Sequence, residues 1–147
     1  MLVARSLSTK HGVEALMNPH GPILIVDDDP DFCSTITELF ESSGHAVVTA
    51  RDGAEALCRL REGLGPCLIL LDLEMPRSDG VSFRREQLAD PALAPIPVIL
   101  HSNRPDLAAI AVQLQAVAHV PKTVDFDALL PLVAAHCYGT NALRGQR

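Results

Sequence analysis

The stretch Cys67–Gly80, CLILLDLEMPRSDG, begins as an unbroken apolar run and ends in turn residues. An apolar run without polar alternation is typical of a strand that is buried on both faces, as in a parallel sheet covered by helices. Asp72 ends this predicted strand, and the following Met75-Pro76 and Asp79-Gly80 break the strand and start a helix. Because open α/β sheets bind ligands beyond the carboxyl ends of their strands, Asp72 lies where a functional carboxylate is expected.

Strand-like and helix-like segments alternate along the rest of the chain. Short apolar runs predict four more strands, at 23–26, 46–50, 98–101 and 118–121. Apolar residues at helical spacing predict five helices, at about 30–43, 52–62, 79–88, 105–114 and 126–136. This alternation with short connections favours a parallel sheet with right-handed crossovers and helices on both faces.

The composition suits one acidic globular domain. The 147 residues are 48% hydrophobic and carry a formal net charge of −6. The arginines are dispersed and form no basic stripe, so direct nucleic-acid binding is not expected. The segment before residue 22 has no apolar run long enough for a signal peptide or a membrane span. We therefore expect a cytoplasmic protein without membrane contact.

We expect residues 22–137 to form the domain, between an N-terminal tail at 1–21 and a C-terminal tail at 138–147. Met17 lies just upstream of the turn that precedes the first strand, so residues 1–16 could come from an upstream start of translation. The four cysteines lack CxxC spacing and lie within apolar patterns: Cys33, Cys58, Cys67 and Cys137. We predict that they are small buried hydrophobes and not a metal or redox site.

Polar residues follow four of the predicted strands at the edge where a parallel sheet opens. Asp27 and Asp28 follow the first strand, and Asp72 ends the third. Ser102 follows the fourth strand and Lys122 the fifth. Carboxylates within ~4–6 Å of one another raise each other's pKa, so such a cluster calls for a cation. Oxygen ligands without His or Cys favour a hard ion such as Mg²⁺.

A plainer interpretation exists for part of this cluster. The run DDDPD at 27–31 could be a solvated loop in which Asp29 caps the next helix. Asp52 is a similar predicted cap for the second helix. We expect both uses in the same loop, with Asp28 as a metal ligand and Asp29 as a cap.

The chain resembles the receiver domains of response regulators in two-component signalling, across about residues 22–136. The resemblance lies in the pair Asp27-Asp28, the run DxxMPxxDG from Asp72 to Gly80, Ser102 thirty positions beyond Asp72, and Lys122. It implies an α/β, flavodoxin-like fold with a doubly wound, five-stranded parallel sheet of order 2-1-3-4-5 and five helices.

The resemblance implies that Asp72 accepts a phosphoryl group from a histidine of a sensor kinase or a phosphotransfer protein. It implies a bound Mg²⁺ with Asp28, Asp72 and the backbone carbonyl of Glu74 as ligands. Asp27 would orient a water molecule on the metal. Lys122 and the metal would neutralise the charge on the phosphoryl oxygens.

The resemblance also implies a switch. The hydroxyl of Ser102 would bond the phosphoryl group and shift the face made by the fourth helix, fifth strand and fifth helix. A homodimer or a contact with a downstream target protein could form through this face. His119 replaces the aromatic switch residue that is usual in the family, so the switch could be weaker or sensitive to pH. Asn103 replaces a small residue, and Thr123 replaces a proline, so we expect a trans peptide bond after Lys122.

The function that we expect is a stand-alone phosphoacceptor that is not an enzyme in the usual sense. Only one helix and a tail follow Lys122, so output would pass through protein contacts or a phosphorelay. One alternative is a receiver-like module that binds partners without phosphorylation. Another is a Mg²⁺-dependent phosphatase, for which the chain lacks a cap insertion or a substrate pocket.

Overall fold

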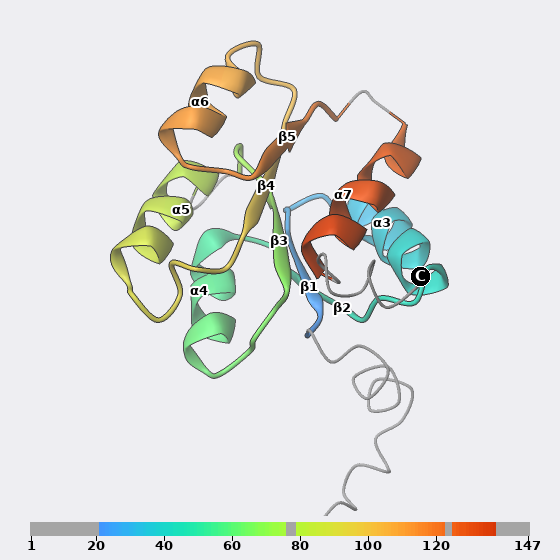
Figure 1. Ribbon diagram of the computed structural model, residues 1–147, viewed down its shortest axis with the longest axis horizontal. Coiled ribbons are helices and arrows are strands. Elements are labelled where there is room, and N and C mark those ends of the chain that lie inside the picture. Colours follow the sequence, from blue (N-terminus) through green and yellow to red (C-terminus); the bar gives the residue numbers. More distant parts are fainter. Residues whose placement is uncertain (1–20, 76–78, 123–124, 138–147) are drawn as a thin grey trace, which may run out of the picture.

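A parallel five-stranded sheet forms the centre of the structure (Figure 1). The computed structural model describes residues 21–75, 79–122 and 125–137. The strands are β1 (Ile23–Val26), β2 (Val47–Ala50), β3 (Leu68–Asp72), β4 (Val98–His101) and β5 (Ala118–Val120). Their order is β2-β1-β3-β4-β5, and every neighbouring pair is parallel. The predicted flavodoxin-like order is therefore confirmed.

Helices cover both faces of this sheet, as Figure 1 shows. One face carries α3 (Pro30–Ser42) and α7 (Leu129–Cys137), and the short 3-10 helix η1 (Phe126–Ala128) leads into α7. The other face carries α4 (Gly53–Arg61), α5 (Gly80–Ala89) and α6 (Leu107–Gln113). Each connection between consecutive strands contains one helix, which brings the chain back to start the next strand in the same direction.

Aspartate side chains begin three of the helices. Asp29, Asp52 and Asp79 each accept hydrogen bonds from backbone N–H groups in the first turn of α3, α4 and α5. These N–H groups have no partner within their own helix, so the caps stabilise each start. The predicted caps Asp29 and Asp52 are confirmed.

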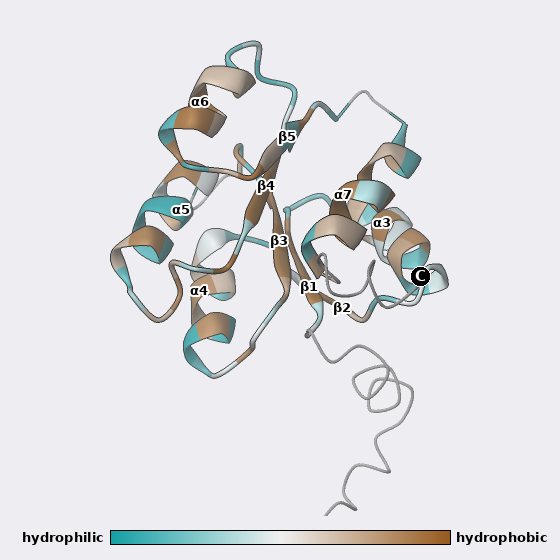
Figure 2. Cartoon of the chain, in the orientation of Figure 1, coloured by the Kyte–Doolittle hydropathy of each residue, from teal (hydrophilic) through white to brown (hydrophobic). Residues whose placement is uncertain are grey.

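The core has two parts, one on each side of the sheet. Leu24 and Val26 of β1 pack with residues of α4, α5 and α6, whereas Ile23 and Ile25 pack with residues of α3 and α7. Successive side chains of a strand point to opposite faces, so a strand between two helical layers must be apolar throughout. Figure 2 shows these hydrophobic strands between helices of mixed hydropathy. This burial makes the central strands a rigid support for the residues at their ends.

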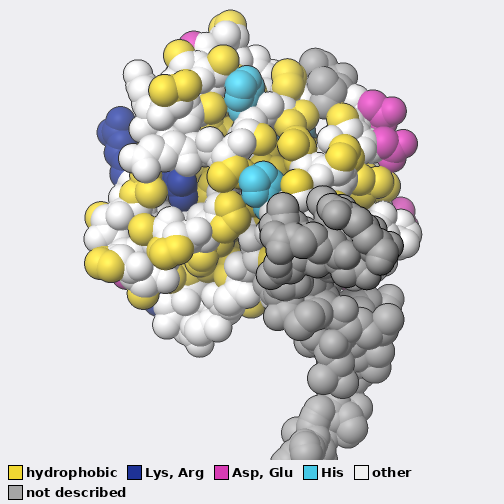
Figure 3. Space-filling model, in the orientation of Figure 1, with side chains coloured by type: hydrophobic (Ala, Val, Ile, Leu, Met, Phe, Trp, Pro, Cys, Tyr) yellow, Lys and Arg dark blue, Asp and Glu magenta, His cyan; other side chains and the backbone are white. Residues whose placement is uncertain are grey.

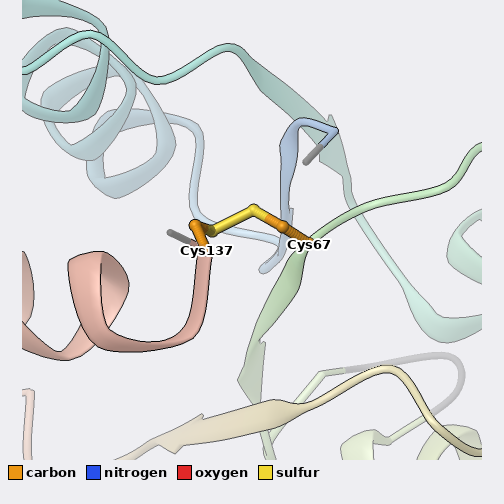
Figure 4. Close-up of a disulfide and its surroundings, with 2 residues drawn as sticks. All are labelled: Cys67 and Cys137. Atoms are coloured by element: carbon orange, nitrogen blue, oxygen red, sulfur yellow. A yellow bond between two sulfur atoms is a disulfide. The ribbon is translucent and has the colours of Figure 1, made fainter. Parts of the chain in front are cut away.

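A disulfide joins the residue before β3 to the last residue of α7 (Figure 4). It links Cys67 to Cys137, which are 70 residues apart in the sequence. The two free cysteines of the described residues are Cys33, which is half-buried, and Cys58, which is exposed. The prediction of four small buried hydrophobes is therefore wrong for the Cys67–Cys137 pair and for Cys58. The physical reason is that the sheet topology, and not the spacing along the chain, brings Cys67 and Cys137 together.

No helix among the described residues is long and apolar enough to cross a membrane. Other predictions fall on residues outside the described ranges. These are the two tails, apart from Gly21, and the trans peptide bond between Lys122 and Thr123.

Candidate functional site

Charged side chains from three strand ends meet at the carboxyl edge of the sheet. Asp27 and Asp28 directly follow β1, Asp72 ends β3, and Lys122 lies two residues beyond β5. One carboxylate oxygen from each of the three aspartates lies within 4.8 Å of the others. Asp27 and Asp72 are buried and Asp28 is exposed, so the cluster has a closed side and an open side.

Lys122 bridges the two buried carboxylates. Its Nζ lies 2.8 Å from Asp27 Oδ2 and 3.5 Å from Asp72 Oδ2. The backbone N–H of Asp29 donates to Asp27 Oδ1 at 2.9 Å. Burial lowers the pKa of Lys122, but its contacts with the carboxylates of Asp27 and Asp72 outweigh burial and raise this pKa overall. The lysine is therefore a cation at physiological pH.

The positive charge of Lys122 does not fully offset the effects that raise the pKa of Asp72. Burial, and then the negative charge of Asp27, raise the pKa of Asp72 to about 6. Lys122 and the backbone N–H of Glu74, which donates to Asp72 Oδ1 at 3.3 Å, lower this pKa only in part. A second cation near Asp72 would favour its ionised form.

The donor set fits a hard divalent cation. Three carboxylates face one ammonium group, and the open side at Asp28 leaves room for water ligands, as Mg²⁺ requires. The nearby thiol of Cys33 does not compete as a ligand. Burial, and then the charge of Asp27, raise the pKa of Cys33 to about 11, so it stays a protonated thiol at neutral pH. Asp27, Asp28 and Asp72 are thus the residues that could hold the metal.

A groove of about 790 Å³ leads to the open side of this cluster. It runs between α3 and β2, and its lining includes Asp28, Glu38 and Arg51.

The two predicted switch residues lie in different surroundings. Ser102 follows β4 and is only 1% exposed, and its Oγ accepts a hydrogen bond from the backbone N–H of Arg104 at 3.2 Å. The N–H of Ser102 donates to the carbonyl of Val120 at 3.4 Å, which ties the loop after β4 to the end of β5. His119, in the middle of β5, is exposed, as is Asn103.

Three aromatic rings beside the cluster carry no predicted role. The face of Phe32 lies under Lys122, with Nζ 5.0 Å from the ring centroid. The Phe32 ring also packs on His101 at a centroid distance of 4.9 Å and on Phe126 at 5.6 Å. Helical spacing places Phe32 on the apolar face of α3. That pattern gives no signal of a contact with a lysine far away in the sequence.

Comparison with known proteins agrees with the fold. The family model for the response regulator receiver domain matches residues 23–134. The transcriptional regulatory protein ZraR of Salmonella typhimurium is 32% identical over 123 residues, which are 82% of this chain and 28% of ZraR. The chain spans between 10% and 40% of the length of such curated relatives.

Solved structures resemble the whole domain. The phosphorylated cyanobacterial phytochrome response regulator RcpA is 30% identical with a TM-score of 0.70, and the match covers 82% of this chain and 96% of that one. The Mn²⁺-bound form of the response regulator Rcp1 is 26% identical with a TM-score of 0.65, and the match covers 78% of this chain and 92% of that one.

Proposed function

The chain belongs to the receiver domain family of two-component response regulators, and from this we propose that it accepts a phosphoryl group on Asp72. The observation that carries the proposal is the state of this carboxylate. Asp72 is buried at a strand end, 3.5 Å from an ammonium group and within 4.8 Å of two further carboxylates. We assign the receiver domain to residues 22–137.

The proposed reaction transfers a phosphoryl group from a phosphohistidine of a sensor kinase or a phosphotransfer protein. A carboxylate oxygen of Asp72 attacks the phosphorus atom, and the P–N bond of the donor breaks. The electron pair of that bond leaves with the imidazole nitrogen, which takes up a proton. The ammonium group of Lys122 then moves toward the negatively charged phosphoryl group and donates a hydrogen bond to one of its oxygens. The ion pair with Asp27 keeps Lys122 near the site.

We propose Mg²⁺ as the cation of the site. Asp28, Asp72 and the backbone carbonyl of Glu74 would hold it, and Asp27 would orient one of its waters. When bound, the ion neutralises charge on the phosphoryl oxygens. The similar structure that is described as Mn²⁺-bound supports a divalent cation in this family.

The proposed output passes through Ser102 and His119. The hydroxyl of Ser102 would exchange its contact with Arg104 for a phosphoryl oxygen, and so pull in the loop between β4 and α6. The face of α6, β5 and α7 would then change shape and bind a target protein or a second copy. Val112 of α6 is 79% exposed and is an apolar side chain available for such a contact.

Two expectations about partners stay predictions. Some relatives are named as transcriptional or DNA-binding regulators, but the matched part is less than half of each. Among the described residues on the face drawn in Figure 3, the few basic side chains lie on the left side of the view and form no stripe across it. This supports the expectation that the receiver domain does not contact nucleic acid directly. That the domain acts alone also stays a prediction.

The test is the intact mass of the protein after incubation with acetyl phosphate and Mg²⁺. We expect the mass of one added phosphoryl group, and we expect neither Asp72→Asn nor the metal-free wild type to acquire it. No adduct, together with no binding of beryllofluoride, would favour the phosphorylation-independent module. Turnover of external phosphate esters would favour the phosphatase.

A further inference from the structure

The ammonium group of Lys122 has two kinds of neighbour. The carboxylates of Asp27 and Asp72 lie 2.8 Å and 3.5 Å from Nζ. The ring face of Phe32 also lies against Nζ, with its centroid 5.0 Å away. A cation within ~6 Å of an aromatic face is attracted by the negative charge above the ring. Nζ lies nearer to Asp27 than to the proposed phosphoacceptor Asp72.

The Phe32 ring is itself fixed by its neighbours. His101 of β4 packs at 4.9 Å between centroids, and Phe126 of η1 meets the ring edge to face at 5.6 Å. His101 is 1% exposed, and neither of its ring nitrogens has a hydrogen-bond partner among the residues that the structure describes. Burial, and then the charge of Lys122, lower the pKa of His101 to about 4, so the ring is neutral at physiological pH. It acts as an aromatic packing partner and not as a second cation beside Lys122.

We propose that Phe32 is a positioning residue for Lys122, whose ammonium group its ring face holds between Asp27 and the phosphoryl oxygens on Asp72. The functional part of this inference rests on the proposed phosphorylation of Asp72. A lysine has a long and flexible stem, and an ion pair has little directional preference. A ring packed between β4 and η1 limits where the ammonium group can move. An aliphatic side chain at position 32 could fill the space but would not attract the cation.

The first arm of the test is NMR spectroscopy of lysine-labelled protein. The chain contains only two lysines, Lys10 and Lys122, so assignment is direct and the mutation of one removes one signal. The ring current of Phe32 should move the CεH₂ protons of Lys122 upfield in the wild type. We expect Phe32→Leu to abolish this displacement and Phe32→Tyr, which keeps the aromatic face, to retain it.

The second arm is the rate of phosphorylation by acetyl phosphate with Mg²⁺. A cation–π contact of ordinary strength corresponds to a loss of roughly three- to tenfold in rate for Phe32→Leu, and Phe32→Tyr should restore the rate. Phe40→Leu is the matched control, because Phe40 is buried in the same helix and contacts His45 instead of the site. It should lower stability and leave both the Lys122 signal and the rate unchanged.

The outcomes separate this inference from the proposed function. An unchanged Lys122 signal in Phe32→Leu would overturn the contact. A lost displacement with an unchanged rate would overturn the positioning role. If the wild type forms no phosphoryl adduct, the proposed function fails, and the NMR comparison alone decides whether Phe32 holds Lys122.

Discussion

The negative charge of buried Asp72 lowers the free energy of unfolding of the protein. Its pKa is about 6 in the folded protein, above its ordinary value of 3.8, because burial and Asp27 oppose ionisation. The folded state therefore binds a proton more tightly than the unfolded state between these pH values. As pH rises from about 4 through 6, the free energy of unfolding falls, and it stays lower above pH 6.

From this we predict that Asp72→Asn stabilises the metal-free protein at pH 8. The expected gain is about 3 kcal/mol in the free energy of unfolding, since the pKa rises from 3.8 to about 6 and a shift of one pKa unit corresponds to ~1.4 kcal/mol. At pH 4 the gain should nearly vanish, because the wild-type carboxyl group is then protonated in the folded state. Urea unfolding with a chelator at both pH values measures the effect. A variant that is less stable than the wild type at pH 8 would contradict it.

At the scale of elements, α5 is tied to the end of α6 by a buried arginine. Arg84 is 3% exposed and donates to the carbonyls of Leu114 and Gln115, both at 3.0 Å. It also donates to the side chain of Gln87 at 2.7 Å. These bonds satisfy carbonyls that the end of α6 leaves without a partner in the helix.

We predict that Arg84→Met destabilises the fold by about 2–4 kcal/mol, because the buried carbonyl of Leu114 and the partly buried carbonyl of Gln115 lose their donor. The exposed neighbour provides the control, and Arg85→Met should change the free energy of unfolding by at most about 0.5 kcal/mol. Thermal or urea unfolding of the two variants distinguishes them. Equal stability of both variants would mean that Arg84 does not join α5 to α6.

The disulfide makes a second connection between elements, from the start of β3 to α7. Without it, α7 is a nine-residue helix that the core holds through Leu129 and Val133. Closing a loop of 70 residues reduces the entropy of the unfolded chain, by an amount equivalent to about 4 kcal/mol of stability.

We therefore predict that a thiol reductant lowers the urea midpoint of the wild type. It should not change the midpoint of the double variant Cys67→Ser/Cys137→Ser, which already lacks the bond. The double variant Cys33→Ser/Cys58→Ser keeps the disulfide and should respond to the reductant as the wild type does. An identical midpoint of the wild type with and without reductant would exclude a stabilising role for the bond.

For the molecule as a whole, the sequence predicts the strands and the charged residues that lie at their ends. Short and mostly apolar runs predict the five strands, and the parallel arrangement then brings Asp27, Asp28, Asp72 and Lys122 to one edge. The glycine at position 80 is likewise required by the local structure after a strand end. A Cβ atom there would collide with the backbone carbonyl of Asp72, so the turn after β3 needs glycine.

Contacts between side chains of distant elements could not be predicted in this way. The periodicity of α5 does not distinguish the buried Arg84 from the exposed Arg85. The disulfide and the contact of Phe32 with Lys122 depend on how helices seat on the sheet. The position of each helix on the sheet follows from the packing of many side chains that are distant in the sequence, and the spacing of residues along the chain does not reveal that packing.

The last prediction concerns the charge balance of the whole fold. The cluster of three carboxylates within 4.8 Å of one another exists only in the folded chain. A cation that binds this cluster therefore stabilises the folded state and not the unfolded state. At a Mg²⁺ concentration of about 100 times its Kd, the free energy of unfolding should rise by about 2.7 kcal/mol. Thermal unfolding across a Mg²⁺ titration measures this rise.

Asp28→Asn should remove most of the Mg²⁺ effect and cost little stability in the absence of metal, because Asp28 is exposed. Asp31→Asn is the control, since Asp31 is an exposed acid in the first turn of α3 that lies outside the cluster. An equal response of both variants to Mg²⁺ would indicate general screening of the net charge of −6 and not a site. A response lost only in Asp28→Asn would mean that the acidic cluster couples the metal to the stability of the entire domain.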